Sequence, residues 1–327
     1  MKILIVSGFL GAGKTTFIKE LTKRCKGDFV ILENEYGNSA VDQQILQQQD
    51  NADVWNLTEG CVCCTKSADM NASIATIEST LEPEFLIVEP SGVGALSNII
   101  RNLKKIEYDR IQLLRPITVL NAQNFIQDYE QYGDVYQDQI KTAGTIVISQ
   151  PENMDAATYD AVSNIVAKVN SAAKVLGSHY TKMDEAWWNS LLTTAYDGAQ
   201  LKAIDESTLE FESFAVKNCC VDSPVSLIWI LQIMLYGGFG KIVRAKGIIK
   251  AGPIWVRFDI AGGQYSIIGL DEEEARNAKA ECVFIGKAID RILLQHMVQK
   301  MGTRKSPIFR TRSGSQPQGR QNVRNLL

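Results

Sequence analysis

The sequence predicts an α/β fold with a mostly parallel, doubly wound sheet, followed by a smaller C-terminal α+β domain. Over about the first 205 residues, short apolar runs of β-type residues alternate with amphipathic segments, which is typical of a parallel sheet covered on both faces. A glycine-rich stretch joins the first apolar run to the first helical segment. After Leu209 short β-type segments surround two helical stretches, which favours a separate α+β unit.

The predicted elements follow from the periodicity of the apolar residues. In one segment, apolar residues at 162, 165, 166 and 169 share one face of a helix. The strands predicted for the first part are Ile3–Val6, Phe29–Leu32, Val54–Leu57, Phe85–Val88, Ile117–Leu120 and Thr145–Ile148. The strands predicted for the second part are Glu210–Val216, Ile242–Ile249, Trp255–Asp259, Tyr265–Ile268 and Cys282–Ile285, with helices over 224–236 and 286–301.

Length and composition set the domain organisation. A chain of 327 residues with 45% hydrophobic residues is long enough for two domains with their own cores. We predict one domain over 1–205 and a second over 209–301. Residues 302–327 carry six basic residues, no acidic residue and few apolar ones, so we expect a basic, disordered tail.

Charge and hydropathy narrow the classes of partner and the compartment. The net charge of −3 gives no general attraction to nucleic acid or to anionic membranes, so we expect no specific partner of either kind. No apolar run reaches the ~18 residues of a membrane helix. The apolar N-terminus is too short for a signal peptide and runs into the glycine-rich stretch. With an odd number of cysteines, seven, we expect a cytoplasmic protein.

The glycine-rich stretch from Gly8 to Thr15 fits the pattern G-x-x-x-x-G-K-[ST] between a strand and a helix. Glycines let the backbone wrap around a phosphate, and the helix N-terminus adds favourable partial charge. Lys14 would reach the β- and γ-phosphates, and the Thr15 hydroxyl would bind Mg²⁺. We assign nucleotide binding to Gly8, Gly11, Ala12, Gly13, Lys14, Thr15 and Thr16.

A second motif follows the predicted strand Phe85–Val88. Glu89 stands at the carboxyl end of this strand, and Gly92 comes three residues later. In P-loop nucleoside triphosphatases an acid at this place helps to hold Mg²⁺. The N–H of a nearby glycine can meet the γ-phosphate. We therefore assign Glu89 to Mg²⁺ and catalysis, and Gly92 to the nucleotide.

Three cysteines within four residues form a candidate transition-metal site. Cys61, Cys63 and Cys64 offer soft thiolate ligands suited to Zn²⁺ and related ions. Three sulfurs leave a coordination position for another ligand, water or a partner protein, which suits a site that must release its metal. Inert buried cysteines and a redox pair are the alternatives.

Taken together, the segments GFLGAGKTT, ENEYG, GCVCC and VEPSG resemble the CobW family of P-loop GTPases, which is similar to the nickel-handling UreG and HypB GTPases. The resemblance covers about residues 1–300, because the segments around 244–247 and 283–286 resemble the C-terminal domain of that family. It implies that Lys14, Glu89 and Glu35 serve catalysis. It also implies that Glu35 and Asp42 are switch acids, and that the three cysteines bind the metal together with Glu35.

The segment expected to recognise the base departs from the family. The resemblance implies Asn-Lys-x-Asp after a strand, whereas this chain has Ser149-Gln150-Pro151-Glu152. We assign base contacts to Ser149, Gln150 and Glu152. The nucleotide is expected to be GTP, with ATP in the same pocket as the alternative.

The resemblance implies a GTP-binding and GTP-hydrolysing metallochaperone. It would be a slow nucleoside triphosphatase that uses Mg²⁺ and delivers Zn²⁺ or Co²⁺ to a client metalloprotein or a cofactor-maturation enzyme. A nucleotide-dependent homodimer is a further expectation. The alternative is a non-hydrolysing or ATP-using scaffold or regulator in metalloenzyme or corrinoid maturation.

Other candidate ligands point to structural roles. Cys219 and Cys220 are adjacent on a predicted strand end, so their side chains would point to opposite faces. His179 follows the last strand of the first sheet and is either an ordinary loop histidine or one that faces the base.

Overall fold

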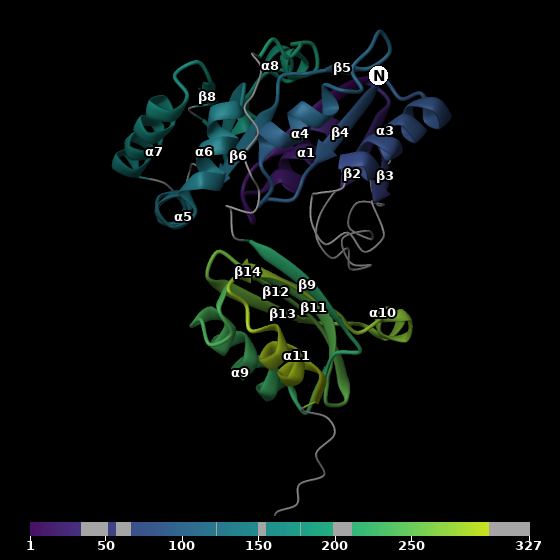
Figure 1. Ribbon diagram of the computed structural model, residues 1–327, viewed down its shortest axis with the longest axis vertical. Coiled ribbons are helices and arrows are strands. Elements are labelled where there is room, and N and C mark those ends of the chain that lie inside the picture. Colours follow the sequence, from purple (N-terminus) through teal and green to yellow (C-terminus); the bar gives the residue numbers. More distant parts are fainter. Residues whose placement is uncertain are drawn as a thin grey trace, which may run out of the picture.

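A computed structural model of the chain places two sheets, each with its own helices (Figure 1). The structure describes residues 1–33, 52–56, 67–121, 123–149, 155–176, 178–198 and 211–300. The predicted fold class is confirmed, because a parallel sheet with helices is followed by a second, antiparallel sheet. The predicted domain limits near 205 and 209 fall outside the described residues and stay a prediction.

The first sheet is parallel, with the strand order β3-β2-β4-β1-β6-β7-β8 and with β5 paired to β1. Its strands are β1 Lys2–Ser7, β2 Phe29–Glu33, β3 Ala52–Asn56, β4 Phe85–Glu89, β5 Gln112–Leu113, β6 Ile117–Asn121, β7 Thr145–Ser149 and β8 Lys174–Leu176. Neither β5 nor β8 was predicted, because two or three residues are too few to show an apolar period.

Helices cover both faces of this sheet. Alternate residues of β1 face opposite sides of the sheet. Leu4 and Val6 pack on α1 and α8, whereas Ile3 and Ile5 pack on α3 and α4. Strands buried on both faces have the nearly continuous apolar sequence seen here. The helices are α1 Lys14–Arg24, α3 Ser67–Leu81, α4 Leu96–Leu103, α5 Phe125–Gln131, α6 Gly133–Thr142, α7 Ala156–Val169, the 3-10 helix η2 Tyr180–Lys182 and α8 Glu185–Leu191.

The second sheet has the order β13-β12-β11-β14-β9, with antiparallel neighbours, and β10 adds to β11 in parallel. Helices α9 and α11 share one apolar core with this sheet. Its elements are β9 Glu212–Lys217, β10 Cys220–Val221, α9 Pro224–Leu235, β11 Lys241–Ala251, β12 Ile254–Ala261, β13 Gln264–Gly269, α10 Glu272–Asn277, β14 Glu281–Lys287 and α11 Arg291–Lys300.

The helix predicted over 286–301 begins later than expected. Strand β14 continues through Lys287, which pairs with Lys241 of β11. Ala288 then takes a left-handed conformation with φ 50°, and this turn separates the strand from α11.

The two sheets meet around the loop that follows β1. The ring of Phe211, just before β9, lies 5.4 Å from that of Tyr132 and 6.2 Å from that of Phe9. The Lys241 ammonium lies 4.9 Å from the centroid of the Tyr132 ring. Ile285 of β14 belongs to the same buried cluster as Phe9. The two parts of the chain therefore share packed side chains.

Within the described residues, each helix is too short or too polar to cross a membrane.

Candidate functional site

The loop between β1 and α1 has the glycine-dependent conformation that phosphate-binding loops need. Gly8 has φ +146°, and a Cβ there would lie 2.3 Å from the carbonyl oxygen of Val119 on β6. Gly13 caps α1 with φ 93°, in the left-handed region that favours glycine. A side chain is excluded by contact at Gly8 and disfavoured by the backbone conformation at Gly13, so the loop backbone runs close to the sheet and turns directly into α1.

Lys14 and the first turn of α1 bring positive charge to this loop. The buried Lys14 ammonium donates to the carbonyl oxygens of Gly8 at 3.1 Å and Phe9 at 3.4 Å, so its side chain folds back over the loop. The first N–H groups of a helix add partial positive charge at the same place. Together these groups form an anion-binding arrangement.

Thr15 and Glu89 come together as the sequence predicts. The Thr15 hydroxyl lies 3.1 Å from each carboxylate oxygen of Glu89, to which it donates, and Glu89 is buried at the end of β4. Glu33 at the end of β2 is also buried, and it pairs in register with Glu89 on the neighbouring strand. A hydroxyl and carboxylates are hard oxygen donors of the kind that Mg²⁺ takes, so this edge of the sheet fits the ion.

Glu33 is a site residue that the sequence analysis did not assign. It is the first residue of the segment ENEYG, and only the strand register places it beside Glu89.

Gly92 brings the loop after β4 onto the nucleotide loop. A Cβ on Gly92 would lie 2.6 Å from the backbone nitrogen of Leu10 and 2.9 Å from the carbonyl carbon of Phe9. The side-chain amide of Gln139 on α6 donates to the Gly92 carbonyl at 3.0 Å, and Gln139 is fully buried. Gln139 was not identified from the sequence, although a glutamine on the apolar face of a helix is a usable signal.

Ser149 and Asn121 lie beside the nucleotide loop from the ends of β7 and β6. A Cβ on Gly13 would lie 3.5 Å from Cβ of Ser149, whose hydroxyl donates to the Leu120 carbonyl at 3.2 Å. The Asn121 amide donates to the Gly11 carbonyl at 3.3 Å. The amide NH₂ of an asparagine can donate this hydrogen bond, whereas the carboxylate of an aspartate can only accept one. Asn121 therefore ties β6 to the loop.

The remaining predicted loop residues differ in burial. Ala12 is buried among apolar side chains, whereas Thr16 is exposed on the first turn of α1.

A hairpin of the second sheet also contacts the nucleotide loop. Cβ of Ala261, the last residue of β12, lies 3.6 Å from where a Cβ of Gly11 would be. The next residue, Gly262, has φ +56°, and a Cβ there would lie 2.4 Å from Nδ2 of Asn124. Nothing in the sequence signals this contact, because it depends on how the two sheets pack.

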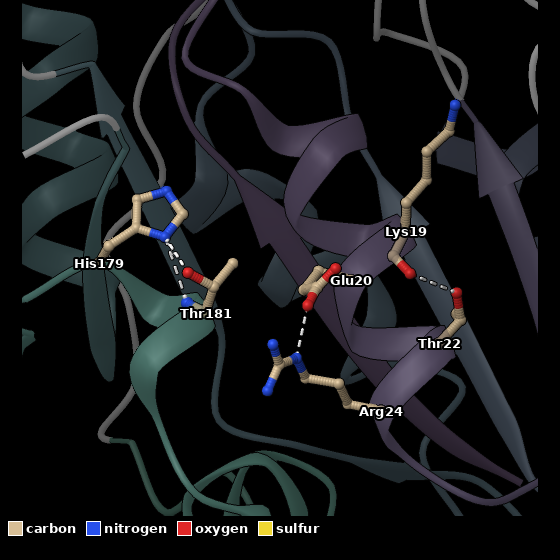
Figure 2. Close-up of polar contacts among 6 residues, drawn as sticks. All are labelled: Lys19, Glu20, Thr22, Arg24, His179 and Thr181. Carbon is tan, nitrogen blue, oxygen red and sulfur yellow. Dashed lines mark hydrogen bonds and ion pairs between the residues drawn. The ribbon is translucent and has the colours of Figure 1, made fainter.

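His179 makes local contacts (Figure 2). Its Nδ1 lies 2.6 Å from the Thr181 hydroxyl and accepts from the Thr181 N–H, which caps η2. The ring stacks on Tyr180, whose own ring packs edge-on against Phe17 of α1. These contacts favour the interpretation of His179 as a loop residue that holds η2 in place.

The predicted metal-binding segment lies outside the described residues. The assignments of Glu35, Asp42, Cys61, Cys63, Cys64, Gln150 and Glu152 therefore stay predictions. In the part of the chain that the structure describes, His, Cys, Asp and Glu side chains form no group of three that could hold a metal ion.

The other cysteines have the surroundings of structural residues. Cys25, Cys219 and Cys282 are buried free thiols, and the Cys219 thiol donates to the Val216 carbonyl. Burial raises the pKa of the Cys282 thiol well above its usual value, so this group stays protonated and unreactive. Cys220 is partly exposed and donates to the Gln299 carbonyl at 3.6 Å.

A parallel sheet, a glycine-rich loop from its central strand into a helix, and a threonine paired with a strand-end glutamate define a P-loop nucleotide-binding protein. The family described as CobW/HypB/UreG, nucleotide-binding domain, matches residues 2–177, and the chain belongs to this family.

Curated relatives cover about half of this chain. The zinc chaperone CobW of Sinorhizobium sp. is 26% identical over 199 residues, which are 51% of this chain and 55% of the relative. The zinc chaperone YjiA of Escherichia coli is 25% identical over 181 residues, 53% and 56% of the two chains. The zinc-regulated GTPase metalloprotein activator 1 of Schizosaccharomyces pombe is 23% identical over 193 residues, 56% and 47%. The chain thus spans about half the length of the curated relatives it matches.

Solved structures with a similar chain path include Zn(II)-bound YjiA GTPase from E. coli, with 16% identity and a TM-score of 0.45 over 91% of this chain and 97% of that one. HypB from Helicobacter pylori in complex with nickel has 16% identity and a TM-score of 0.43 over 58% and 83%.

Proposed function

We propose that the protein is a GTP-dependent metallochaperone that binds and hydrolyses nucleotide at the loop from Gly8 to Thr15 and delivers a transition metal, Zn²⁺ or Co²⁺, to a client. The observation that carries the proposal is the pairing of Thr15 with Glu89 beside Lys14, in a member of a family whose curated relatives are named zinc chaperones.

The site residues that the structure describes would divide the proposed reaction among them. Loop N–H groups and Lys14 bind the phosphates, and the Gly92 N–H faces the γ-phosphate. Thr15 and Glu89 would hold Mg²⁺, with the carboxylate of Glu33 adding negative charge beside it. When bound, Mg²⁺ neutralises charge that develops on the phosphates. Lys14 and Glu89 are therefore the proposed catalytic residues, together with Glu35.

The cargo metal is assigned to the cysteine motif. Cys61, Cys63 and Cys64 are proposed to hold Zn²⁺ or Co²⁺ as thiolates, with Glu35 as a further ligand. Glu35 follows Glu33 at the end of β2, and β2 pairs both with β4, which carries Glu89, and with β3, which precedes the cysteine motif. This chain connection supports coupling between nucleotide binding and metal binding. The partners would be a client metalloprotein or cofactor-maturation enzyme and a nucleotide-dependent second copy, in the cytoplasm.

The decisive experiment is a competition titration of Zn²⁺ and Co²⁺ against a chromophoric chelator. It is run without nucleotide, with a Mg²⁺–GTP analogue and with a Mg²⁺–ATP analogue. Coupling of a few kcal/mol, typical of linked sites, should tighten the metal at least ~10-fold with GTP. Tightening with ATP instead would change the base assignment of Ser149, Gln150 and Glu152.

Two variants separate the nucleotide and metal sites. Cys63→Ser should lose tight metal binding and keep nucleotide affinity. Lys14→Ala should lose turnover and keep nucleotide-free metal affinity. Metal binding by Cys63→Ser equal to that of the wild type would refute the cysteine assignment, and normal turnover by Lys14→Ala would refute the nucleotide assignment.

A non-hydrolysing or ATP-using scaffold is the second candidate. The departure at Ser149-Gln150-Pro151-Glu152 favours it, and the Ser149 hydroxyl is already engaged by the Leu120 carbonyl. Metal affinity that is the same in all three titrations, with no turnover of either nucleotide, would favour this candidate.

A further inference from the structure

The outer face of α9 exposes an apolar stripe. Val225 is 60% exposed, Trp229 62%, Ile233 36% and Tyr236, the residue that caps the helix, 90%. The inner face of the same helix is already packed, because Leu227, Ile230, Leu231 and Met234 are buried in the core of the second sheet. The side chains of the stripe therefore do not contribute to the core of this domain. Exposed apolar patches of this kind mark interaction sites.

A second helix that packs into the same core also exposes apolar residues. Ile292 is 85% exposed and Leu293 43% exposed on α11, which covers the same face of the second sheet as α9 (Figure 1). With ~150–250 Å² for each large aromatic side chain and less for each aliphatic one, the exposed apolar area is on the order of 600 Å². This approaches the ~800 Å² per partner of a standard protein interface.

The chemistry of the stripe points to a second copy of the chain as its occupant. From Ser223 to Gly240 the sequence contains no acidic, basic or histidine residue. Two such helices can therefore face each other without opposing like charges. The absence of Lys and Arg also argues against a membrane surface, because helices that lie on membranes carry basic residues on their polar face.

The spacing of the stripe is self-complementary. Three residues of the stripe, 225, 229 and 236, and the half-buried Gln232 beside Ile233 follow steps of four, three and four, the spacing of a helix–helix seam. In an antiparallel pair with a two-fold axis between positions 230 and 231, Val225 faces Tyr236 of the partner subunit, and Trp229 faces Gln232 of the partner subunit. Each pairing sets a smaller side chain against a larger one, as an isologous interface requires.

We propose that the protein forms a symmetric homodimer through antiparallel pairing of α9, with Ile292 and Leu293 of α11 at the edge of the interface. This dimer uses the second sheet and its helices. It is therefore independent of the nucleotide and distinct from a dimer formed across the nucleotide loop.

Sedimentation equilibrium of the full chain across micromolar concentrations tests the proposal, with and without nucleotide. The wild type should dimerise without nucleotide, and this dimer should persist with nucleotide even where the nucleotide-dependent second copy adds further association. Trp229→Glu places a charge in each half of the seam and should raise the dissociation constant about 100-fold, as expected for a central aromatic residue of an interface. Ile268→Glu, at a 52% exposed position on β13, is the matched control and should leave it unchanged.

A double variant tests the register. Adding Gln232→Lys to Trp229→Glu places opposite charges face to face twice across the two-fold axis, so dimerisation should recover at least ~10-fold at low salt. Thermal unfolding of every variant checks that the fold is retained.

Three results would overturn the proposal. The first is a wild type that stays monomeric throughout. The difference in iodide quenching of tryptophan fluorescence between the wild type and Trp229→Phe then tells whether the stripe is covered by another part of the chain or left for a different protein. The second is undiminished dimerisation of Trp229→Glu. The third is a double variant that is no tighter than the single one, which would exclude this register.

Discussion

Replacing Gly92 with alanine would measure how strongly the loop after β4 depends on its contact with the nucleotide loop. The new Cβ would lie 2.6 Å from the backbone nitrogen of Leu10 and 2.9 Å from the carbonyl carbon of Phe9. Both are backbone atoms of a packed segment, so side-chain rotation cannot relieve the overlap. Carbon atoms in contact prefer about 3.5–4.0 Å, so one of the loops must move by roughly 1 Å.

The expected cost follows from this displacement. Overpacking of this kind typically costs about 1–3 kcal/mol. Weakening the bond from Gln139 to the Gly92 carbonyl adds about 1 kcal/mol, because the buried Gln139 amide loses its acceptor. Together these costs should lower the free energy of unfolding by about 2–4 kcal/mol. We also expect nucleotide affinity to fall about tenfold, because the displaced loop carries the phosphate-binding N–H groups.

Urea unfolding followed by circular dichroism and titration with a fluorescent nucleotide analogue measure the two effects. The control is Gly269→Ala at the end of β13, where a Cβ would meet no atom within 4 Å. If the two variants unfold within about 0.5 kcal/mol of each other and bind nucleotide equally, the steric reasoning is wrong.

Three further predictions concern packing and titration. The Asn170 side-chain amide donates to three carbonyl oxygens at the end of α6, at 2.8–3.1 Å. A carboxylate would repel these oxygens, so Asn170→Asp should lower the free energy of unfolding, measured in urea, by about 2–4 kcal/mol. Burial raises the pKa of Asp128 to about 6 despite its bond from the Tyr136 hydroxyl. The folded chain therefore holds this proton more tightly than the unfolded chain does. The free energy of unfolding should fall as the pH rises from about 4 to about 6. The loss should be about 1–2 kcal/mol once partial exposure is allowed for. Asp128→Asn should remove this loss, and thermal unfolding at pH 4.5 and pH 7.5 would show it. Phe211→Ala removes the ring that lies between Phe9 and the second sheet. Because this ring is only partly buried, the change should cost about 2 kcal/mol, less than the ~3–5 kcal/mol of a fully buried phenylalanine, and it should split one calorimetric transition into two; a single unshifted transition would contradict this.

The nucleotide loop could be predicted from the sequence because its physics is local. Gly8, Gly13, Lys14 and Thr15 stand at fixed spacing between a strand and a helix, and that spacing alone determines where the loop lies. Glu89 was identified for a similar reason, since it ends a strongly apolar strand. In both cases a short segment carries the whole signal.

Residues that act across long distances in the chain could not be predicted in the same way. Glu33 becomes a neighbour of Glu89 only through the strand order of the first sheet, and Gln139 reaches Gly92 only through the packing of α6. Ala261 meets Gly11 only because the two sheets pack together. These contacts depend on tertiary geometry, which apolar periodicity does not encode.

The hairpin between β12 and β13 has a consequence for how this protein tolerates change. Tips of two-residue hairpins are usually places where insertions and protease cleavage do little harm. Here the tip is Gly262-Gly263, and Gly262 already lies against Asn124. A lengthened tip would press on Asn124, which follows β6 beside the nucleotide loop, whereas a side chain at Gly263 would meet no atom within 4 Å. An exchange of the second sheet between relatives should therefore succeed only where the length of this hairpin is kept.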